Sequence, residues 1–294
     1  MNTQTIKEFW QNNPCGEHLV LDEKRQFESF KKFFEKYDEF RYNTEGHILK
    51  NLDRIDIRGK KILEVGIGQA ADSYELIKRD AIYYGMDITE EACHRAQIRF
   101  KIFNAPYKMI VNADVCRIPF LDEYFDVIYS HGVLHHISQI SKAVKEIHRV
   151  LKKNGQLVIM LYARRSLNYY WSILFMRRLL FLGLFFLDHL TLQRLIKSKL
   201  LRKHIDHAKQ VGLFHYLSTE YFLSKNTDGP DNPLSHVYSR NEVMKVFNEF
   251  HFERFEQHFL NERHLPLLRI LPSSLKNKLS SWWGWHLWCY GIKP

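Results

Sequence analysis

The amino-acid sequence predicts a seven-stranded, doubly wound α/β sheet with a helical insertion after its fifth strand. Apolar runs of strand length alternate with helical patterns through residues 60–163, and the loops between them are short. Strand-like runs return at 252–260 and 285–292. Alternation on short connections is typical of a parallel sheet that carries helices on both faces.

The first predicted strand is 60–67, KKILEVGI, a nearly continuous apolar run that suits a strand buried on both faces. A helix over 70–79 and a strand over 81–88 follow, and Thr89 is the expected N-cap of the next helix. The later elements of this region are strands at 107–114, 125–133 and 156–163, and a helix over 139–155 that stops at Gly155.

The remainder of the chain predicts additions to this sheet. Ser239 and Glu242 form a capping box for one more helix. The two closing strands are expected to be an antiparallel pair, because their connection is short for a full crossover. The expected domain plan is an N-terminal helical cap (1–54), a cofactor-binding core (55–163), a basic apolar helical insertion with a substrate loop (164–238), and a C-terminal helix with closing strands (239–294).

Composition excludes several classes of protein. Hydrophobic residues make up 45% of the 294 residues and charged residues 26%, so the chain is neither wholly disordered nor collagen-like nor a multi-span membrane protein. The first ten residues lack the apolar core of a signal peptide. Four scattered cysteines, with no metal-ligand spacing, indicate free thiols in a reducing compartment. We therefore expect a cytoplasmic protein, and a peripheral position at the inner membrane face is compatible with that expectation.

A ligand-binding turn is predicted where the first strand ends. Gly66 and Gly68 allow a tight turn and close approach of a ligand to the backbone, and the following helix directs its N-terminus there. Asp87 lies 19 residues beyond Gly68, at the end of the second strand. A carboxylate at that position can accept hydrogen bonds from both hydroxyls of a ribose.

Several motifs together resemble class I S-adenosylmethionine-dependent methyltransferases, in particular the small-molecule group that includes ubiquinone-type and sterol-type methylases. The residues that carry the resemblance are Glu64-x-Gly66-x-Gly68, Asp87, Ala113-Asp114, Pro119-Phe120, and the stretches 125–137 and 148–162. It covers about residues 55–163 and implies a Rossmann-like fold that uses S-adenosylmethionine as cofactor. Ala70 stands where the family usually has a third glycine.

The resemblance also implies roles for single residues. Glu64, Gly66 and Gly68 would shape the pocket for the methionine part of the cofactor. The remaining implied cofactor-binding residues are Asp87 for the ribose hydroxyls, Ile88 and Val115 against the adenine, Asp114 for the adenine amino group, and Ser130 and His131 beside the sulfonium.

Candidate catalytic residues follow the fourth and fifth strands. A base is needed only if the methyl acceptor loses a proton early, and neutral imidazole suits that task near pH 7. His131 and His135 are the candidates after the fourth strand, and Tyr162 is a candidate at the end of the fifth. No metal site is expected, because the histidines lack nearby carboxylates at ligand spacing.

Most of the net charge of +10 belongs to one apolar segment. Residues 164–210 contain ten basic and two acidic side chains. The stretch 171–204 has too few uninterrupted apolar residues to span a bilayer, and its second half, 190–204, sets leucines among basic residues. Three alternatives stay open for it: contact with an anionic membrane surface, the roof of an apolar acceptor pocket, and a homodimer face, with the charges solvated.

Together these observations predict methyl transfer from S-adenosylmethionine to a small, lipid-like or apolar acceptor, which could be lipid-linked. RNA or protein methylation is an alternative, supported only by the net charge, and the Ser130-His131-Gly132-Val133 sequence argues against nucleic-acid bases as the acceptor. A non-catalytic cofactor-binding protein of the same fold is the other alternative.

Overall fold

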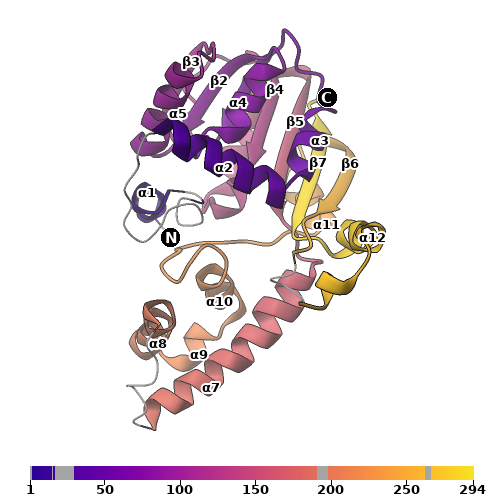
Figure 1. Cartoon of the computed structure of the whole chain (residues 1–294). Coiled ribbons are helices and arrows are strands. Elements are labelled where there is room, and N and C mark those ends of the chain that lie inside the picture. The colour runs from indigo at the N-terminus through magenta and orange to yellow at the C-terminus, as the bar shows by residue number, and fades with distance from the viewer. Residues whose placement is uncertain (1, 15, 17–29, 191–197, 262–265) are drawn as a thin grey trace. The chain divides into compact units, whose positions relative to one another are not determined.

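The computed structural model describes residues 2–14, 16, 30–190, 198–261 and 266–294. Within these ranges seven strands form one sheet with the order β3-β2-β1-β4-β5-β7-β6 (Figure 1). The strands are β1 (Lys61–Val65), β2 (Ile82–Asp87), β3 (Met109–Asn112), β4 (Phe125–His131), β5 (Leu151–Tyr162), β6 (His251–His258) and β7 (His286–Ile292). The predicted seven-stranded doubly wound sheet is therefore confirmed.

The first five strands run parallel, with β1 between β2 and β4. The side chains of β1, β2 and β4 are mostly buried, as expected of strands covered on both faces, whereas those of the edge strand β3 are exposed or half-buried. Because parallel strands point the same way, their carboxyl ends meet at one edge of the sheet, and ligands bind at that edge in folds of this type.

The last two strands are antiparallel to their neighbours. Asn154 N donates to Lys293 O (2.9 Å) and Ala163 N donates to Trp285 O (2.8 Å), so β7 runs opposite to β5. Trp285 N donates to Phe259 O (2.9 Å), which joins β7 to the end of β6. The expected antiparallel pair is present, and its connection contains the 3₁₀ helix Pro266–Ile270 and α12 (Ser273–Trp283).

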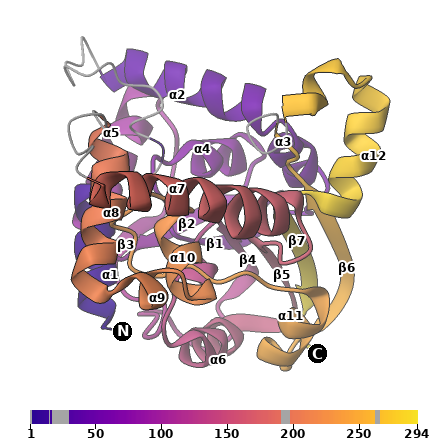
Figure 2. The same ribbon diagram turned by 90° about the horizontal axis from the view of Figure 1, so that it is seen from below.

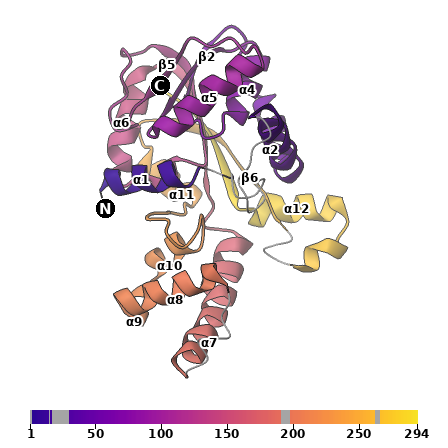
Figure 3. The same cartoon turned by 60° about the vertical axis from the view of Figure 1, so that its left-hand side comes forward.

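Helices cover both faces of the parallel part of the sheet. Figures 2 and 3 show α2, α4 and α5 on one side of the strands and α6 on the other. These helices and those that accompany them are α2 (Phe30–Thr44), α3 (His47–Leu52), α4 (Ala71–Lys78), α5 (Glu90–Ile102), α6 (Ile140–Val150) and α11 (Arg240–Val246). Thr89 is the N-cap of α5, as predicted, and its side chain accepts from Ala92 N at 3.3 Å.

The predicted end of α6 is wrong. The helix ends at Val150, and residues 151–155 belong to β5 instead of forming a helical last turn with a Gly155 stop. Leu151 is fully buried and pairs with Phe125 at the start of β4, and Asn154 bonds Lys293 on β7. Burial and strand pairing in this sheet outweigh the local helical pattern.

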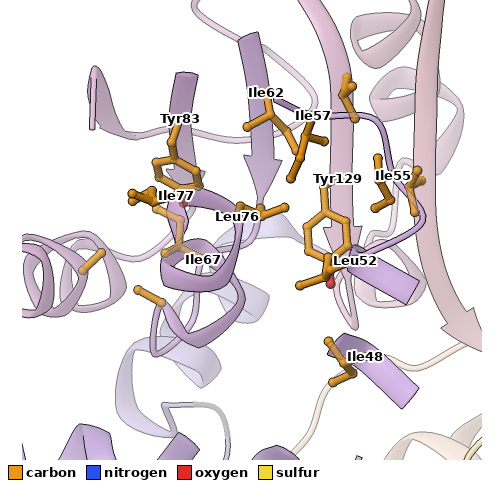
Figure 4. Close-up of a cluster of buried hydrophobic side chains, with 14 of the residues drawn as sticks. Ile48, Leu52, Ile55, Ile57, Ile62, Ile67, Leu76, Ile77, Tyr83 and Tyr129 are labelled. Atoms are coloured by element: carbon orange, nitrogen blue, oxygen red, sulfur yellow. The ribbon is translucent and has the colours of Figure 1, made fainter. Parts of the chain in front are cut away.

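A continuous apolar core joins β1 to the helices that cover it. Ile48 and Leu52 of α3 point into the same cluster as Ile62 of β1 and Leu76 of α4 (Figure 4). Tyr83 and Tyr129 bring aromatic rings into this cluster from β2 and β4. Cys93 and Cys289 are buried free thiols and Cys116 is a half-buried one; Cys15 lies outside the described residues.

The chain divides into two compact units. The first contains residues 2–161, 240–256 and 288–294, and the second contains residues 162–239 and 257–287. The second unit includes the predicted insertion, built from the π-helix Asn168–Arg177, α7 (Arg178–His189), α8 (Lys199–Val211), α9 (Leu213–Tyr216) and α10 (Thr219–Lys225). Its boundaries lie close to 164 and 238, but residues 257–287, assigned from the sequence to the closing part of the core, group with the insertion.

Candidate functional site

The turn after β1 is closely packed against the loop that follows β4. Gly66 has a φ of +83°, and its N–H donates to Met86 O at 2.8 Å. A Cβ atom at this position would lie 2.1 Å from Cγ2 of Val133. Both the backbone conformation and the lack of space therefore require glycine here.

Two further residues of this turn are left-handed. Gly68 has a φ of +52°, and Ala70 has a φ of +57° as the N-cap of α4. Ala70 is fully buried, so its methyl group packs in the core while its backbone keeps the conformation that favours glycine. An alanine therefore occupies, in a left-handed conformation, the position where the family usually has its third glycine.

Asp87 lies beside this turn, at the carboxyl end of β2. Its Oδ2 accepts from Gly68 N (3.3 Å), and its Oδ1 accepts from Thr89 N and Thr89 Oγ1 (2.9 Å each). Burial raises the pKa of this carboxyl, while the hydrogen bonds from Thr89 and Gly68 favour the ionised form. The backbone N–H of Ile67 is a further donor to this carboxylate, so the turn after β1 and the start of α5 both hold Asp87 in place.

The loop after β3 joins the same edge. Ala113 N and Asn112 Nδ2 both donate to Asp87 O, at 2.9 and 3.0 Å. Asp114 follows directly, half-buried, and its Oδ1 accepts from Cys116 N at 2.9 Å. Val115 is buried, whereas Ile88 is half-buried. The residues implied for the ribose and the adenine are therefore brought to one edge.

Glu64 is a buried acid whose carboxyl group is held by neighbouring hydroxyl groups. Ser73 Oγ and Tyr83 OH both donate to its Oε2, the latter at 2.6 Å. Burial and the charge of Asp72 raise the pKa of Glu64 to about 8. The carboxyl group is consequently mostly protonated at neutral pH and fixes β1 to β2 and α4.

A polar cluster that sequence reasoning missed surrounds Asp72. Arg41 of α2 donates to both carboxylate oxygens, from Nε at 3.0 Å and from Nη2 at 2.8 Å. Tyr42 OH and Tyr129 OH donate to the same carboxylate at 3.1 and 2.9 Å. Despite burial, Arg41 lowers the pKa of Asp72 well below its usual range. Asp72 was visible as an acid in the first turn of α4, but nothing local pointed to Arg41.

The same arginine determines the state of His131. Arg41 Nη2 lies 3.1 Å from His131 Nδ1, and a guanidinium can only donate, so Nδ1 accepts. The imidazole is therefore neutral, with its proton on Nε2. Burial and the charge of Arg41 lower its pKa to about 3. This arrangement does not favour the predicted role of His131 as a base near pH 7.

The other predicted residues occupy different environments. Ser130 is buried and its Oγ donates to Val65 O at 2.9 Å, which links β4 to β1. His135 is fully buried in the 3₁₀ turn Leu134–His136. Tyr162 belongs to the second unit, where its hydroxyl donates to Asp228 Oδ1 at 3.0 Å and its ring stacks on Trp285 at 4.4 Å. Ser130 and Tyr162 thus have structural partners.

Helix α1 (Thr3–Asn12) lies along the carboxyl edge. Gln11 Oε1 accepts from Glu90 N at the start of α5, at 3.1 Å. The Trp10 ring meets the His136 ring edge to face at 5.0 Å.

Comparison with known proteins identifies the region that contains this site. Residues 63–159 match the model of the methyltransferase domain family. A ubiquinone biosynthesis O-methyltransferase of Pseudomonas syringae pv. tomato is 27% identical over 123 residues, 41% of this chain and 52% of that protein. A phosphatidylethanolamine N-methyltransferase of Cereibacter sphaeroides is 28% identical over 113 residues, 38% of this chain and 55% of that protein.

The chain spans about half the length of these curated relatives. Among solved structures, a SAM-dependent methyltransferase from Aquifex aeolicus has a TM-score of 0.50 at 15% identity, with 92% of this chain and 100% of that chain covered. At that identity the likeness bears on the fold alone.

Proposed function

We propose that this chain, a class I S-adenosylmethionine-dependent methyltransferase by its fold and by the domain at residues 63–159, transfers a methyl group to a small-molecule acceptor. The observation that carries the proposal is the carboxylate of Asp87, held beside the left-handed glycines that end β1. The relatives named above methylate small molecules according to their names.

The residues at this edge fit S-adenosylmethionine as the cofactor. Asp87 is a carboxylate at the end of β2, the group that accepts hydrogen bonds from ribose hydroxyls in folds of this type. Gly66 and Gly68 keep side chains out of the turn, so a ligand can approach the backbone there. Asp114, at the same edge, is the acceptor that the resemblance assigns to the adenine amino group. Together these residues would hold the nucleoside part of the cofactor.

When bound, the cofactor supplies a methyl group on a positively charged sulfonium. This makes the neutral state of His131 useful, because an imidazolium at the end of β4 would repel that charge. Arg41 itself is compensated by Asp72, with which it forms two hydrogen bonds. His131 offers an N–H donor rather than a base, so we assign the rate enhancement to alignment of the acceptor with the methyl group.

Titration calorimetry tests the cofactor assignment. Asp87→Ala should weaken binding of S-adenosylhomocysteine by about 1.5–3 kcal/mol, the usual cost of losing hydrogen bonds to a charged group. Asp56→Ala removes a carboxylate whose side chain is 78% exposed and should leave affinity unchanged. Wild-type protein that binds neither S-adenosylhomocysteine nor S-adenosylmethionine would refute the functional proposal.

We further propose that the acceptor is lipid-like. The phospholipid named in the Cereibacter sphaeroides relative and the aromatic, apolar core of the second unit support this choice. The test is incubation of the protein with isotopically labelled methyl donor and fractionated cell extract. We expect label in the chloroform-soluble fraction. Label confined to water-soluble small molecules would contradict the lipid-like acceptor alone, and label in RNA or protein would contradict the small-molecule assignment.

A further inference from the structure

The helix Asn168–His189 exposes apolar residues and directs polar residues inward, the reverse of an ordinary helix on the surface of a soluble protein. It is 22 residues long and combines the π-helix with α7, and only 17% of its most apolar 18-residue stretch is buried. A surface helix normally turns a charged or polar face to water. Here the water-facing side is apolar.

The exposed side contains almost only large apolar side chains. Leu179, Leu180 and Phe186 are 58%, 60% and 57% exposed. The exposed residues that continue this side, all on the same helix or at its end, are Tyr170, Trp171, Phe175, Leu187 and Leu190. We call these residues the apolar stripe.

The polar residues of the helix face its own unit instead. Arg177 Nη1 donates to Asn226 O at 2.5 Å, and Arg178 Nη2 donates to Thr219 Oγ1 at 3.2 Å. Asp188 is buried between Arg202 and Lys209 of α8, at 2.5 Å from each. Apolar partners share that side, since Phe181 packs on Tyr216 at a ring distance of 4.6 Å. In Figures 1 and 3 no described element of this unit covers the side of α7 that faces away from α8 and α10.

The length and composition of this helix correct one expectation from the sequence. Residues 171–204 were judged too poor in uninterrupted apolar residues to span a bilayer, yet the helix is long and apolar enough to do so, with a mean hydropathy of 1.6. Its inward side is nevertheless committed to polar partners within the unit. A helix with one side packed on protein and one apolar side suits the plane of a membrane interface.

We propose that the apolar stripe docks the second unit on an anionic lipid bilayer, with the helix lying in the interface. The charge of the surrounding segment favours an anionic bilayer as the partner, because residues 164–210 contain ten basic and two acidic side chains. Lys199, at the start of α8, is exposed close along the chain to the end of the stripe. Anionic headgroups attract such basic segments. This inference does not depend on the proposed methyl transfer.

The stripe lies earlier in the chain than the sequence suggested. The expected interface helix was the second half of 171–204, from 190 onward. Residues 191–197 lie outside the described part of the chain, and α8 begins only at Lys199. The apolar residues that the structure exposes belong to the first half instead.

Vesicle flotation of the full chain tests the proposal. We expect the wild type to float with phosphatidylglycerol vesicles at low salt, and to bind phosphatidylcholine vesicles at least tenfold more weakly. The double variant Leu179→Gln/Phe186→Gln should lose at least tenfold in partitioning. Leu121→Gln, which changes a leucine that is 75% exposed in the first unit, is the matched control and should float like the wild type. Circular dichroism checks that each variant is folded.

Three outcomes would overturn the proposal. The first is wild-type protein that does not float with anionic vesicles at low salt. The second is a double variant that is folded and floats as well as the wild type. The third is a concentration-dependent dimer, seen by analytical ultracentrifugation, that the double variant loses while neither protein binds vesicles; this would assign the stripe to a second copy of the chain. None of these measurements depends on cofactor binding or activity.

Discussion

Two buried acids, Glu64 and Asp72, lie in the same core in opposite protonation states. Asp72 has Arg41 as a counter-ion and is ionised. Glu64 receives hydrogen bonds only from the hydroxyls of Ser73 and Tyr83, and burial together with the charge of Asp72 keeps its proton bound. The pair shows how one cation, placed beside one of two carboxyls, separates their pKa values.

Glu64 should therefore make the protein less stable as the pH rises. Its pKa is about 8 in the fold against an ordinary 4.5, so unfolding releases a proton between those values. The stability it contributes is complete below pH 4.5 and is lost as the pH rises through 8. Relative to Glu64→Gln, which is neutral throughout, the wild-type free energy of unfolding should fall by roughly 3 kcal/mol between pH 5 and 8. Urea unfolding of both proteins at several pH values measures this; parallel curves would contradict it.

His131 should stay neutral across the physiological range. With its pKa lowered to about 3 by burial and by Arg41, its ring should not titrate between pH 5 and 8. Nitrogen chemical shifts from NMR should report the Nε2–H form throughout, because Nδ1 accepts from Arg41. The signal that disappears in His131→Asn identifies the residue. A midpoint near the ordinary 6.5 would disprove the assigned hydrogen bond.

At the scale of elements, the unit that forms the site is β1, its turn and α4. The turn combines positive φ angles at Gly66, Gly68 and Ala70 within five residues. Tight contact with Val133 then fixes the turn against the loop after β4. The backbone at the carboxyl edge is consequently rigid without any ligand contact, which favours a preformed site.

Gly66→Ala should cost about 2–4 kcal/mol in stability. The new methyl group adds a clash with Val133 to the cost of a left-handed backbone. Gly59→Ala measures the cost of the left-handed backbone alone, since Gly59 has a φ of +68° and nothing lies within 4 Å of its Cβ position. That control should cost about 1–2 kcal/mol. Chemical denaturation of both variants measures their free energies of unfolding. Equal losses of stability would show that the Val133 side chain moves to avoid the clash.

Most elements of the first unit could be predicted from the sequence because their signals are local. Continuous apolar runs located β1, β2 and β4, and the Thr89 cap located the start of α5. The end of α6 could not be found this way, because pairing of Leu151 with Phe125 is a contact across 26 residues. The outward apolar side of the helix Asn168–His189 could not be predicted either, since composition alone does not indicate which side of a helix packs against protein.

The candidate site was predicted in part for the same reason. Gly66, Gly68 and Asp87 belong to one local strand-turn-helix-strand pattern, and the structure brings them together. Arg41 precedes that pattern and reaches Asp72 across 31 residues, so no spacing within the motif could indicate it. His131 was found by position, but its neutral, proton-donating state depends on this distant arginine.

At the scale of the whole molecule, Lys293 fastens β7 to the parallel part of the sheet. Its Nζ donates to His148 O (3.0 Å), Leu151 O (2.8 Å) and Glu123 Oε1 (3.2 Å). Lys293→Met should lower the free energy of unfolding by about 2–3 kcal/mol, because buried carbonyls lose a charged donor. Lys153→Met, at an exposed neighbouring position, should change it by less than about 0.5 kcal/mol. Thermal and urea unfolding of both variants measure this difference. If Lys293→Met and Lys153→Met lowered the free energy of unfolding equally, this role of Lys293 would be contradicted.

The position of β7 in the sheet has a consequence for synthesis on the ribosome. β7 follows both β5 and β6 in the chain but lies between them in the sheet. Until β7 emerges, β5 presents an open, apolar edge and β6 has no strand to pair with. Such an unpaired edge is a template for association with other nascent chains. The interval before β7 is translated is therefore when this protein most needs a chaperone.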